Sequence, residues 1–336
     1  MTKLITGKDA SGGIGRQVRR DLGGAMSTPL VSVVLPVRDG AAFVGQAISS
    51  ILTQTLDAFE LLVVDDGSRD ATPAIIVAAL DPRVRMLTQP GLGLVPALNR
   101  GLAEARGCYV ARMDADDVAM PERFARQAAA LDAHPNVAAL GSACLVIGHD
   151  DTTLGHRNPP TEPAVIHAML RQGNCMIHPT MMLRRAAVLD AGGYRPAFRL
   201  AEDFDLWLRL SERHDLMNLP ECLLSYRQHA AQSSWQDVEQ RALSELGALV
   251  VAEQRRAGME DPAGRVPLVT RAFLQAIGVP EAAITRHITV RAMDAAKEAI
   301  AAGHRASARE TIGLLLRQPG LHPRTRLHAW LLRLRS

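Results

Sequence analysis

Short apolar runs alternate with segments of helical period along the first half of the chain. Residues 31–37 are mostly apolar, and Val44, Ala47, Ile48 and Ile51 then recur at the three- and four-residue spacing of a helix. The same alternation continues, with short polar connections, as far as residue 147. Further strands are expected at residues 60–66, 83–87, 108–113 and 137–147, and further helices at residues 71–80, 95–106 and 121–133.

This alternation predicts an α/β fold. Strands that alternate with helices through short connections favour a Rossmann-like, mostly parallel sheet with helices on both faces. The following stretch mixes short strands with one amphipathic helix at 204–213, and the pattern after Trp235 is helical to the end. We therefore expect a flexible leader (1–30), an α/β domain (31–235) and an α-helical C-terminal extension (236–336).

The expected leader is rich in glycine and charge and has no hydrophobic period. Its Gly7, Gly13 and Gly15 are similar to the nucleotide-binding glycines of short-chain dehydrogenases. In that class the glycines follow a strand and open a helix, whereas only a few residues precede them here. A dinucleotide site is therefore not expected in the leader.

The composition is ordinary for a globular protein. Of the 336 residues, 47% are hydrophobic and 22% are charged. No apolar run reaches the length of about 18 residues that a membrane span needs, and the first residues lack the apolar segment of a secretory signal. The four cysteines include no Cys-x-x-Cys pair, which is typical of reduced thiols. We expect a cytoplasmic protein.

Polar clusters follow three of the predicted strands. They occupy residues 36–39, 65–68 and 114–117, and the last contains Asp114 and Asp116. In parallel sheets, ligands bind beyond the carboxyl ends of the strands, where these clusters would meet. Mg²⁺ and Mn²⁺ prefer carboxylate and phosphate oxygens as ligands. The sequence thus predicts a divalent cation that holds a diphosphate at this edge, although each cluster alone fits a turn equally well.

Several segments, in this order, resemble the inverting glycosyltransferases of family 2, which have the GT-A fold. They are VSVVLPVRDG, ELLVVDDGSRDAT, LNRGLAEARGCYVARMDADD, LAEDFDLWLRL and YRQHAAQSS. The resemblance runs from about residue 31 to residue 234 and leaves out the leader and the extension. It implies a GT-A domain that binds a nucleotide sugar.

The resemblance implies how the donor is bound. Asp66 matches the carboxylate that accepts a hydrogen bond from the base, typically uracil. Asp114 and Asp116 match the DxD motif, in which Asp116 is expected to bind Mn²⁺ or Mg²⁺ directly and Asp114 to reach the ribose or the metal through water. His229 matches a distal position that in some relatives completes the metal or diphosphate site. The loop expected to surround the base and ribose consists of Pro36, Val37, Arg38 and Asp39.

The resemblance also implies the groups that act on the acceptor. Asp203, in the pair Glu202-Asp203, matches the general base, which takes the proton of the acceptor hydroxyl as its oxygen attacks the sugar C1. His178 matches a segment that shapes the acceptor side. From the residues alone, Glu202-Asp203 fits an acidic first turn stabilised by the helix dipole, and the lone His229 fits a structural histidine.

These assignments describe a transferase that adds a single sugar. The donor is a nucleotide sugar, with UDP favoured, and the acceptor is a hydroxyl in glycan, lipid-linked or cell-surface polysaccharide synthesis. The QxxRW signature of processive synthases does not follow the Glu-Asp pair. A non-catalytic nucleotide-sugar binding relative and a nucleotidyltransferase are the alternatives, but the latter class usually has a glycine-rich phosphate loop, and residues 36–40 contain one glycine.

Charge divides the chain, because acidic residues are in excess in the expected α/β domain and basic residues in the extension. Leu314–Leu316 and Trp330–Leu334, with interleaved arginines, suit a helix at the surface of an anionic inner membrane face. They suit packing against the body or in a homodimer equally well. Nucleic acid is not an expected partner, because the basic residues are not interleaved with aromatic ones.

Overall fold

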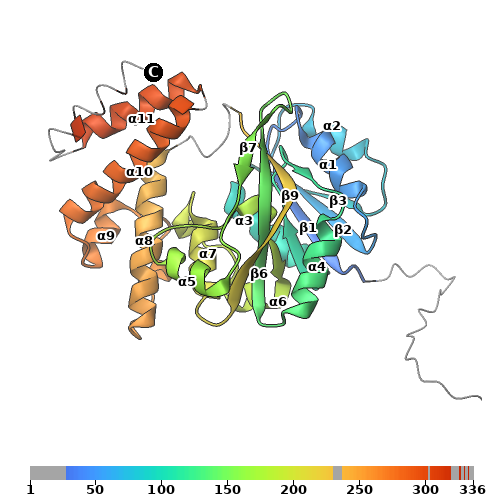
Figure 1. Cartoon of the computed structure of the whole chain (residues 1–336), viewed down its shortest axis with the longest axis horizontal. Helices are drawn as coiled ribbons and strands as arrows, with labels where there is room; N and C mark the ends of the chain where they lie inside the picture. The colour runs from blue at the N-terminus through green and yellow to red at the C-terminus, as the bar shows by residue number, and fades with distance from the viewer. Residues whose placement is uncertain are drawn as a thin grey trace, which may run out of the picture.

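The computed structural model describes residues 28–229, 237–301, 303–318, 325, 326, 329 and 332. Figure 1 shows an α/β body beside a group of C-terminal helices. The expected leader, residues 1–30, lies outside the described residues except for its last three, and so do its Gly7, Gly13 and Gly15.

The first half of the sheet is parallel, as predicted. Its strands are β1 (Val31–Val37), β2 (Phe59–Asp65), β3 (Val84–Thr88) and β4 (Tyr109–Arg112), in the spatial order β3-β2-β1-β4. The buried runs of β1 and β2 have no exposed position, which is expected for strands covered on both faces. All four strands were predicted to within one residue at either end.

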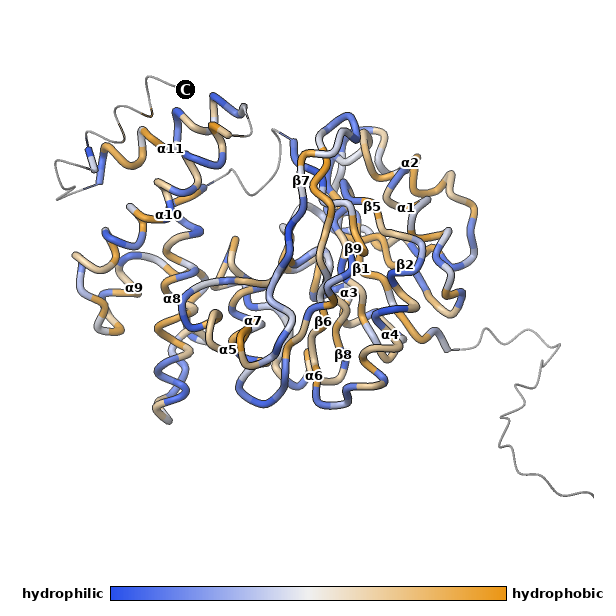
Figure 2. The backbone as a smooth tube through the Cα atoms, viewed as in Figure 1, coloured by the Kyte–Doolittle hydropathy of each residue, from blue (hydrophilic) through white to orange (hydrophobic). Residues whose placement is uncertain are grey.

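The second half of the sheet is mixed. It contains β8 (Met182–Arg184), β6 (Val137–Ile147), β9 (Asp215–Arg227) and β5 (Val118–Ala119), in continuation of the order after β4. β8 is antiparallel to β4 and β6, while β6 and β9 are parallel. β7 (Thr153–Arg157) pairs with β6, is mostly exposed and is mostly hydrophilic in Figure 2. The strand pairs are therefore parallel as far as β4, and antiparallel pairing begins where β8 joins β4.

Helices cover both faces of the sheet. α1 (Val44–Leu52), α2 (Thr72–Val77) and α4 (Arg123–Ala133) share one buried cluster with alternate residues of β1 and β2. α3 (Leu94–Glu104) shares the other cluster with the intervening strand residues. The apolar period of the sequence explains this arrangement, because the buried face of α1 consists of the four residues that predicted it, Val44, Ala47, Ile48 and Ile51.

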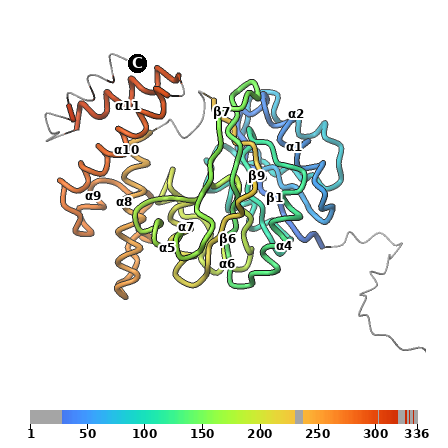
Figure 3. Tube along the Cα trace, in the orientation of Figure 1, coloured from blue at the N-terminus to red at the C-terminus, as the bar shows by residue number. Residues whose placement is uncertain are grey.

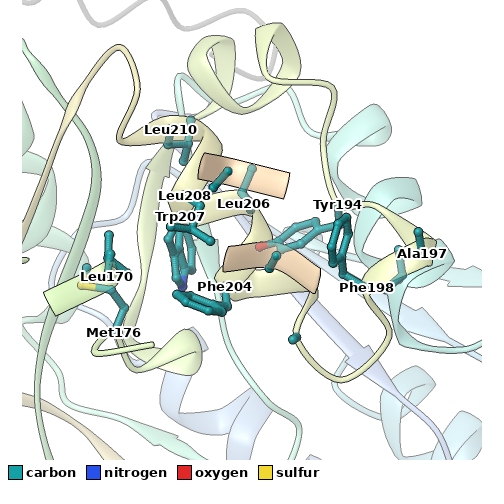
Figure 4. Close-up of a cluster of buried hydrophobic side chains, with 14 of the residues drawn as sticks. Leu170, Met176, Tyr194, Ala197, Phe198, Phe204, Leu206, Trp207, Leu208 and Leu210 are labelled. Carbon is teal, nitrogen blue, oxygen red and sulfur yellow. The ribbon is translucent and has the colours of Figure 1, made fainter. Parts of the chain in front are cut away.

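The second face also carries α5 (Pro163–Leu170), α6 (Arg185–Asp190) and α7 (Glu202–Leu210). α7 is the amphipathic helix predicted at 204–213; it begins two residues before the predicted start and also ends earlier than predicted. Figure 4 shows its apolar side chains inside the core, with Trp207 next to Phe204. Trp207 is fully buried, which makes it a core residue rather than a platform for a sugar ring.

The C-terminal region is helical, as predicted. It contains α8 (Val238–Arg256), α9 (Arg271–Ala276), α10 (Glu281–Ala301) and α11 (Arg305–Arg317). Figure 3 shows α8 beside α7, and α8 shares the buried cluster of α7. A separate cluster joins α10 to α11.

The leucines of the tail pack inward where they are described. Leu315 is fully buried and Leu332 is 8% exposed, and both belong to the cluster that joins α10 and α11. Trp330, Leu331 and Leu334 lie outside the described residues. Among the described helices, none has the length and apolar character needed to cross a bilayer.

A buried ionic network joins α7 to the helices that follow it. Asp205 is fully buried and accepts hydrogen bonds from Arg195 Nε at 2.9 Å and from Arg209 Nε at 3.0 Å. Arg195 also reaches Asp261, whose carboxylate accepts a hydrogen bond from Arg255 of α8 at 2.8 Å. The network fixes the helix whose first turn contains Glu202 and Asp203.

We expect Asp205→Ala to lower the free energy of unfolding by about 3–5 kcal/mol, because the buried guanidinium of Arg209 loses its counter-charge and that of Arg195 keeps only Asp261. Urea denaturation followed by circular dichroism measures this change. Glu122→Ala is the matched control, since Glu122 forms an exposed pair with Arg126 and should affect stability little. Similar small effects of both substitutions would contradict the role given to the network.

Candidate active site

The loops that follow β1 and β2 are joined to each other at the predicted edge. The Asp39 backbone N–H donates to Ser68 Oγ at 2.9 Å, and the Asp39 carboxylate accepts from the Arg69 backbone N–H at 2.7 Å. The Ala41 N–H donates to Asp70 Oδ2 at 3.0 Å. Asp39 has a left-handed backbone with φ of 49°, a conformation that aspartate tolerates better than most residues. Polar contacts thus fix the shape of this edge.

A cavity of about 620 Å³, here called the rim cavity, opens at this edge. The predicted residues Pro36, Val37, Arg38 and Asp39 line it from the β1 side. Asp114, Asp116 and His229 line it from the β4 and β9 side. The structure therefore brings together seven predicted residues from three segments that are far apart in the sequence.

Three carboxylates in the rim region are close enough to share one cation. Asp114, Asp116 and Asp117 each offer an oxygen, and these oxygens lie within 4.8 Å of one another. His229 Nε2 lies 2.8 Å from Asp116 Oδ2. This set of oxygen donors fits Mn²⁺ or Mg²⁺.

Asp117 is a member of this cluster that the sequence did not single out. It is 1% exposed, and its Oδ1 accepts from the Arg227 backbone N–H at 2.9 Å. Among the described residues, no group hydrogen-bonds its buried Oδ2. Burial and the neighbouring charges of Asp116 and Asp114 raise the pKa of Asp117 well above the ordinary range. The surrounding basic groups therefore do not fully balance the negative charge of the cluster.

Asp66 lies next to the rim cavity, with its Oδ2 3.9 Å from Nη1 of Arg38, which lines that cavity. It is 5% exposed and is not among the residues that line the rim cavity. Its carboxylate accepts hydrogen bonds from Gln89 Nε2 at 2.6 Å and from the backbone N–H groups of Leu92 at 2.7 Å and Gly93 at 2.9 Å. In this structure Asp66 fixes the loop before α3, and its contact with a base stays a prediction.

A second cavity of about 400 Å³, here called the inner cavity, lies against α7. His178, Glu202 and Asp203 line it together with Asn174. Asn174 Nδ2 donates to Asp203 Oδ2 at 2.8 Å and so orients the carboxylate. Asn174 could not be predicted from the sequence, because a single asparagine in a loop has many structural uses.

Burial sets the protonation of the groups in the inner cavity. It raises the pKa of Asp203, and together with the charge of Asp203 it raises the pKa of Glu202 to about 7. Burial lowers the pKa of His178 well below its usual range, with Arg112 acting in the same direction. His178 is therefore neutral near pH 7, with its Nε2 2.9 Å from the Tyr194 hydroxyl.

The two cavities adjoin. Leu94, Arg112, Asp114 and Tyr226 line both of them. Arg112 Nη1 forms an ion pair with Asp114 Oδ2 at 2.5 Å. The carboxylates of the rim cavity and the acids of the inner cavity thus belong to one continuous site.

The C-terminal helices form part of the inner cavity. Arg241 and Glu245 reach it from α8, and Arg291 and Glu298 reach it from α10. Glu245 pairs with Arg291 Nε at 2.5 Å. Sequence reasoning missed this wall, because the basic excess of the extension did not reveal which of its residues face the body.

Comparison with known proteins identifies the family. The model described as Glycosyl transferase family 2 matches residues 32–193. The amylovoran biosynthesis glycosyltransferase AmsE of Erwinia amylovora is 35% identical over 187 residues, which are 54% of this chain and 69% of that protein. The O-antigen biosynthesis glycosyltransferase WbnJ of Escherichia coli is 32% identical over 206 residues, which are 60% of this chain and 80% of that protein. The chain belongs to glycosyltransferase family 2.

Solved structures share the fold of this family 2 glycosyltransferase. S. aureus TarS 1–349 in complex with UDP-GlcNAc is 16% identical with a TM-score of 0.53, over 90% of this chain and 89% of that one. The mannosyltransferase PcManGT from Pyrobaculum calidifontis, in complex with GDP-Man and Mn²⁺, is 20% identical with a TM-score of 0.51, over 94% and 88%. The expected GT-A fold and the expected class of enzyme, a glycosyltransferase, are confirmed.

Glu202 gives the glycosyltransferase a stability that depends on pH. Because its pKa of about 7 in the folded chain exceeds the ordinary 4.5, the folded chain binds this proton more tightly than the unfolded chain. This stabilisation is present below the unfolded pKa and is lost as the pH rises toward about 7, with a slope of up to about 1.4 kcal/mol per pH unit. Urea unfolding should show a steeper loss in the wild type than in Glu202→Gln, which keeps only the contribution of the other buried acids.

The exposed Glu221→Gln variant is the matched control and should keep the wild-type slope. If Glu202→Gln also keeps that slope, Glu202 is not the buried acid that titrates in this range.

Proposed function

We propose that the protein is a metal-dependent, inverting glycosyltransferase that transfers one sugar from a nucleoside diphosphate sugar to an acceptor hydroxyl. The observation that carries this proposal is the continuity of the two cavities, because a carboxylate cluster lines one of them and Asp203 lines the other. A donor bound at the first cavity and an acceptor in the second would meet where both are lined by Arg112 and Asp114.

Asp116, Asp114 and His229 are the residues that would hold the cation. When bound, a divalent cation supplies Lewis-acid stabilisation of the negative charge on a diphosphate leaving group. The closeness of His229 Nε2 to Asp116 Oδ2, at 2.8 Å, supports a shared role for these two side chains. Pro36, Val37, Arg38 and Asp39 would surround the base and ribose, since they line the opposite wall of the rim cavity.

Asp203 is the proposed general base. Its Oδ2 accepts a hydrogen bond from Asn174, which restricts the orientation of the carboxylate. Burial raises the pKa of Asp203, and a carboxylate with a raised pKa takes up a proton more readily than an exposed one does near neutral pH. His178, which is neutral and buried, and Glu202 would shape the acceptor side of the same cavity.

The comparisons support the class of donor and the class of pathway. TarS and PcManGT have been solved with UDP-GlcNAc and GDP-Man respectively, and both ligands are nucleoside diphosphate sugars. AmsE and WbnJ are named for amylovoran and O-antigen biosynthesis. We propose a UDP-sugar donor and an acceptor in glycan, lipid-linked or cell-surface polysaccharide synthesis, at the cytoplasmic side of the membrane.

Calorimetric titration with UDP, with and without Mn²⁺, tests the donor site. We expect Mn²⁺ to raise the affinity for UDP at least about tenfold in the wild type, and Asp116→Ala to abolish this gain because the cation loses a carboxylate ligand. Asp203→Asn is the matched control and should bind UDP like the wild type, since it changes an acid of the other cavity.

Absence of UDP binding in both conditions would remove the uridine assignment, and GDP and dTDP would be titrated next. Failure of all three nucleotides in the wild type would contradict the proposed function.

A further inference from the structure

Arg112 occupies the junction of the two cavities. It is the last residue of β4, is 4% exposed and lines both cavities. Side chains of a strand alternate between its faces, so Arg112 lies on the same face as Val110. Val110 belongs to the buried cluster that includes Phe204 and Trp207 of α7. The guanidinium group is therefore placed on the side of the sheet where Asp203 lies.

The backbone of Arg112 is fixed on both sides. Its N–H donates to the Met181 carbonyl at 2.9 Å, and its carbonyl accepts from Arg123 Nη2 at 2.8 Å. The hydrogen-bond donors of its side chain are less completely paired. Its buried Nε makes no hydrogen bond with the described residues, whereas Nη1 is paired with the Asp114 carboxylate.

Arg209, in the same α/β domain, is a buried arginine whose hydrogen-bond donors are paired. Its guanidinium donates to Asp205 at 3.0 Å and to the Gly193 carbonyl at 2.7 Å. A buried N–H without an acceptor is costly, so a guanidinium that lines a cavity and has an unpaired donor is suited to bind acceptor oxygens of a ligand. Arg112 has this property and Arg209 does not.

The charge of Arg112 also acts on both parts of the site. Burial raises the pKa of Asp114, of Glu202 and of Asp203, and the positive charge of Arg112 opposes this rise in all three. The guanidinium thus lies between the carboxylate that lines the rim cavity and the acids on α7.

We propose that Arg112 binds the sugar that is transferred, by donating hydrogen bonds from its guanidinium to hydroxyl oxygens of that sugar. The inference rests on the proposed function, because a sugar that joins a diphosphate in the rim cavity to an acceptor near Asp203 must pass through the junction. Four residues line both cavities: Leu94 is apolar, Asp114 has no donor when ionised and Tyr226 has one hydroxyl, whereas the guanidinium of Arg112 has several N–H donors, of which Nε is unpaired.

Binding of UDP and of UDP-sugars to Arg112→Lys separates this role from a purely structural one. The probes are UDP, UDP-glucose, UDP-galactose and UDP-GlcNAc in the presence of Mn²⁺. Lysine keeps the charge beside Asp114 but loses the planar set of donors. We expect Arg112→Lys to bind UDP within about twofold of the wild type. Its affinity for the UDP-sugar that the wild type binds best should fall about tenfold, the effect of losing a charged hydrogen bond.

Asp114→Asn is the matched control, since it removes the ion pair from the other side. It should weaken UDP and the UDP-sugar by the same factor. If Arg112→Lys does the same, Arg112 acts through Asp114 and the proposal is wrong. Equal affinity of the wild type for UDP and for every UDP-sugar also contradicts it, because no sugar contact then exists.

A wild-type chain that binds none of these nucleotides contradicts the proposed function itself, which distinguishes the two failures. Arg112→Gln is the second variant if the lysine variant does not fold, with the same expected loss for the UDP-sugar alone. A crystal structure of the wild type with Mn²⁺ and the best UDP-sugar provides a test without substitution. Arg112 nitrogens within about 3.2 Å of a sugar hydroxyl are expected, and a guanidinium that touches no sugar atom overturns the proposal.

Discussion

The parallel register of β2, β1 and β4 is the constraint on which the site depends. Val37 pairs with Asp65, and Val34 pairs with Arg112, so the chain leaves all three strands at the same edge. Because side chains alternate along a strand, a slip of one residue in β4 would turn Arg112 away from α7 and into the other core. The carboxylates beyond β4 would then no longer face the loop that follows β1.

The second requirement is the fixed position of α7. Its first turn contains Glu202 and Asp203, and one turn later the buried Asp205 is held by two arginines. Through Arg195 and Asp261 the same network reaches α8, which also contributes Glu245 to the inner cavity. The helical extension thus forms part of the wall of the candidate site.

Local patterns predicted the elements whose signal lies within a few residues. The buried face of α1 and the strands β1 to β4 were predicted from the spacing of apolar residues. The acidic cluster after β4 was evident directly from the sequence. β5 has two residues and β8 has three, so only pairing with distant strands defines them. The hydrogen bonds of Asp66 with Gln89, Leu92 and Gly93 could not be predicted, because a family match does not show which neighbours bind its oxygens. Arg112 was missed although it is the last residue of β4 and stands two residues before Asp114.

The anomeric configuration of the first product tests the account most directly. Slow hydrolysis of a UDP-α-sugar, with water in place of the acceptor, can be followed by proton NMR before the released sugar equilibrates. An in-line attack assisted by Asp203 predicts that the β-anomer appears first. First release of the α-anomer would contradict the single displacement on which the roles of both cavities rest.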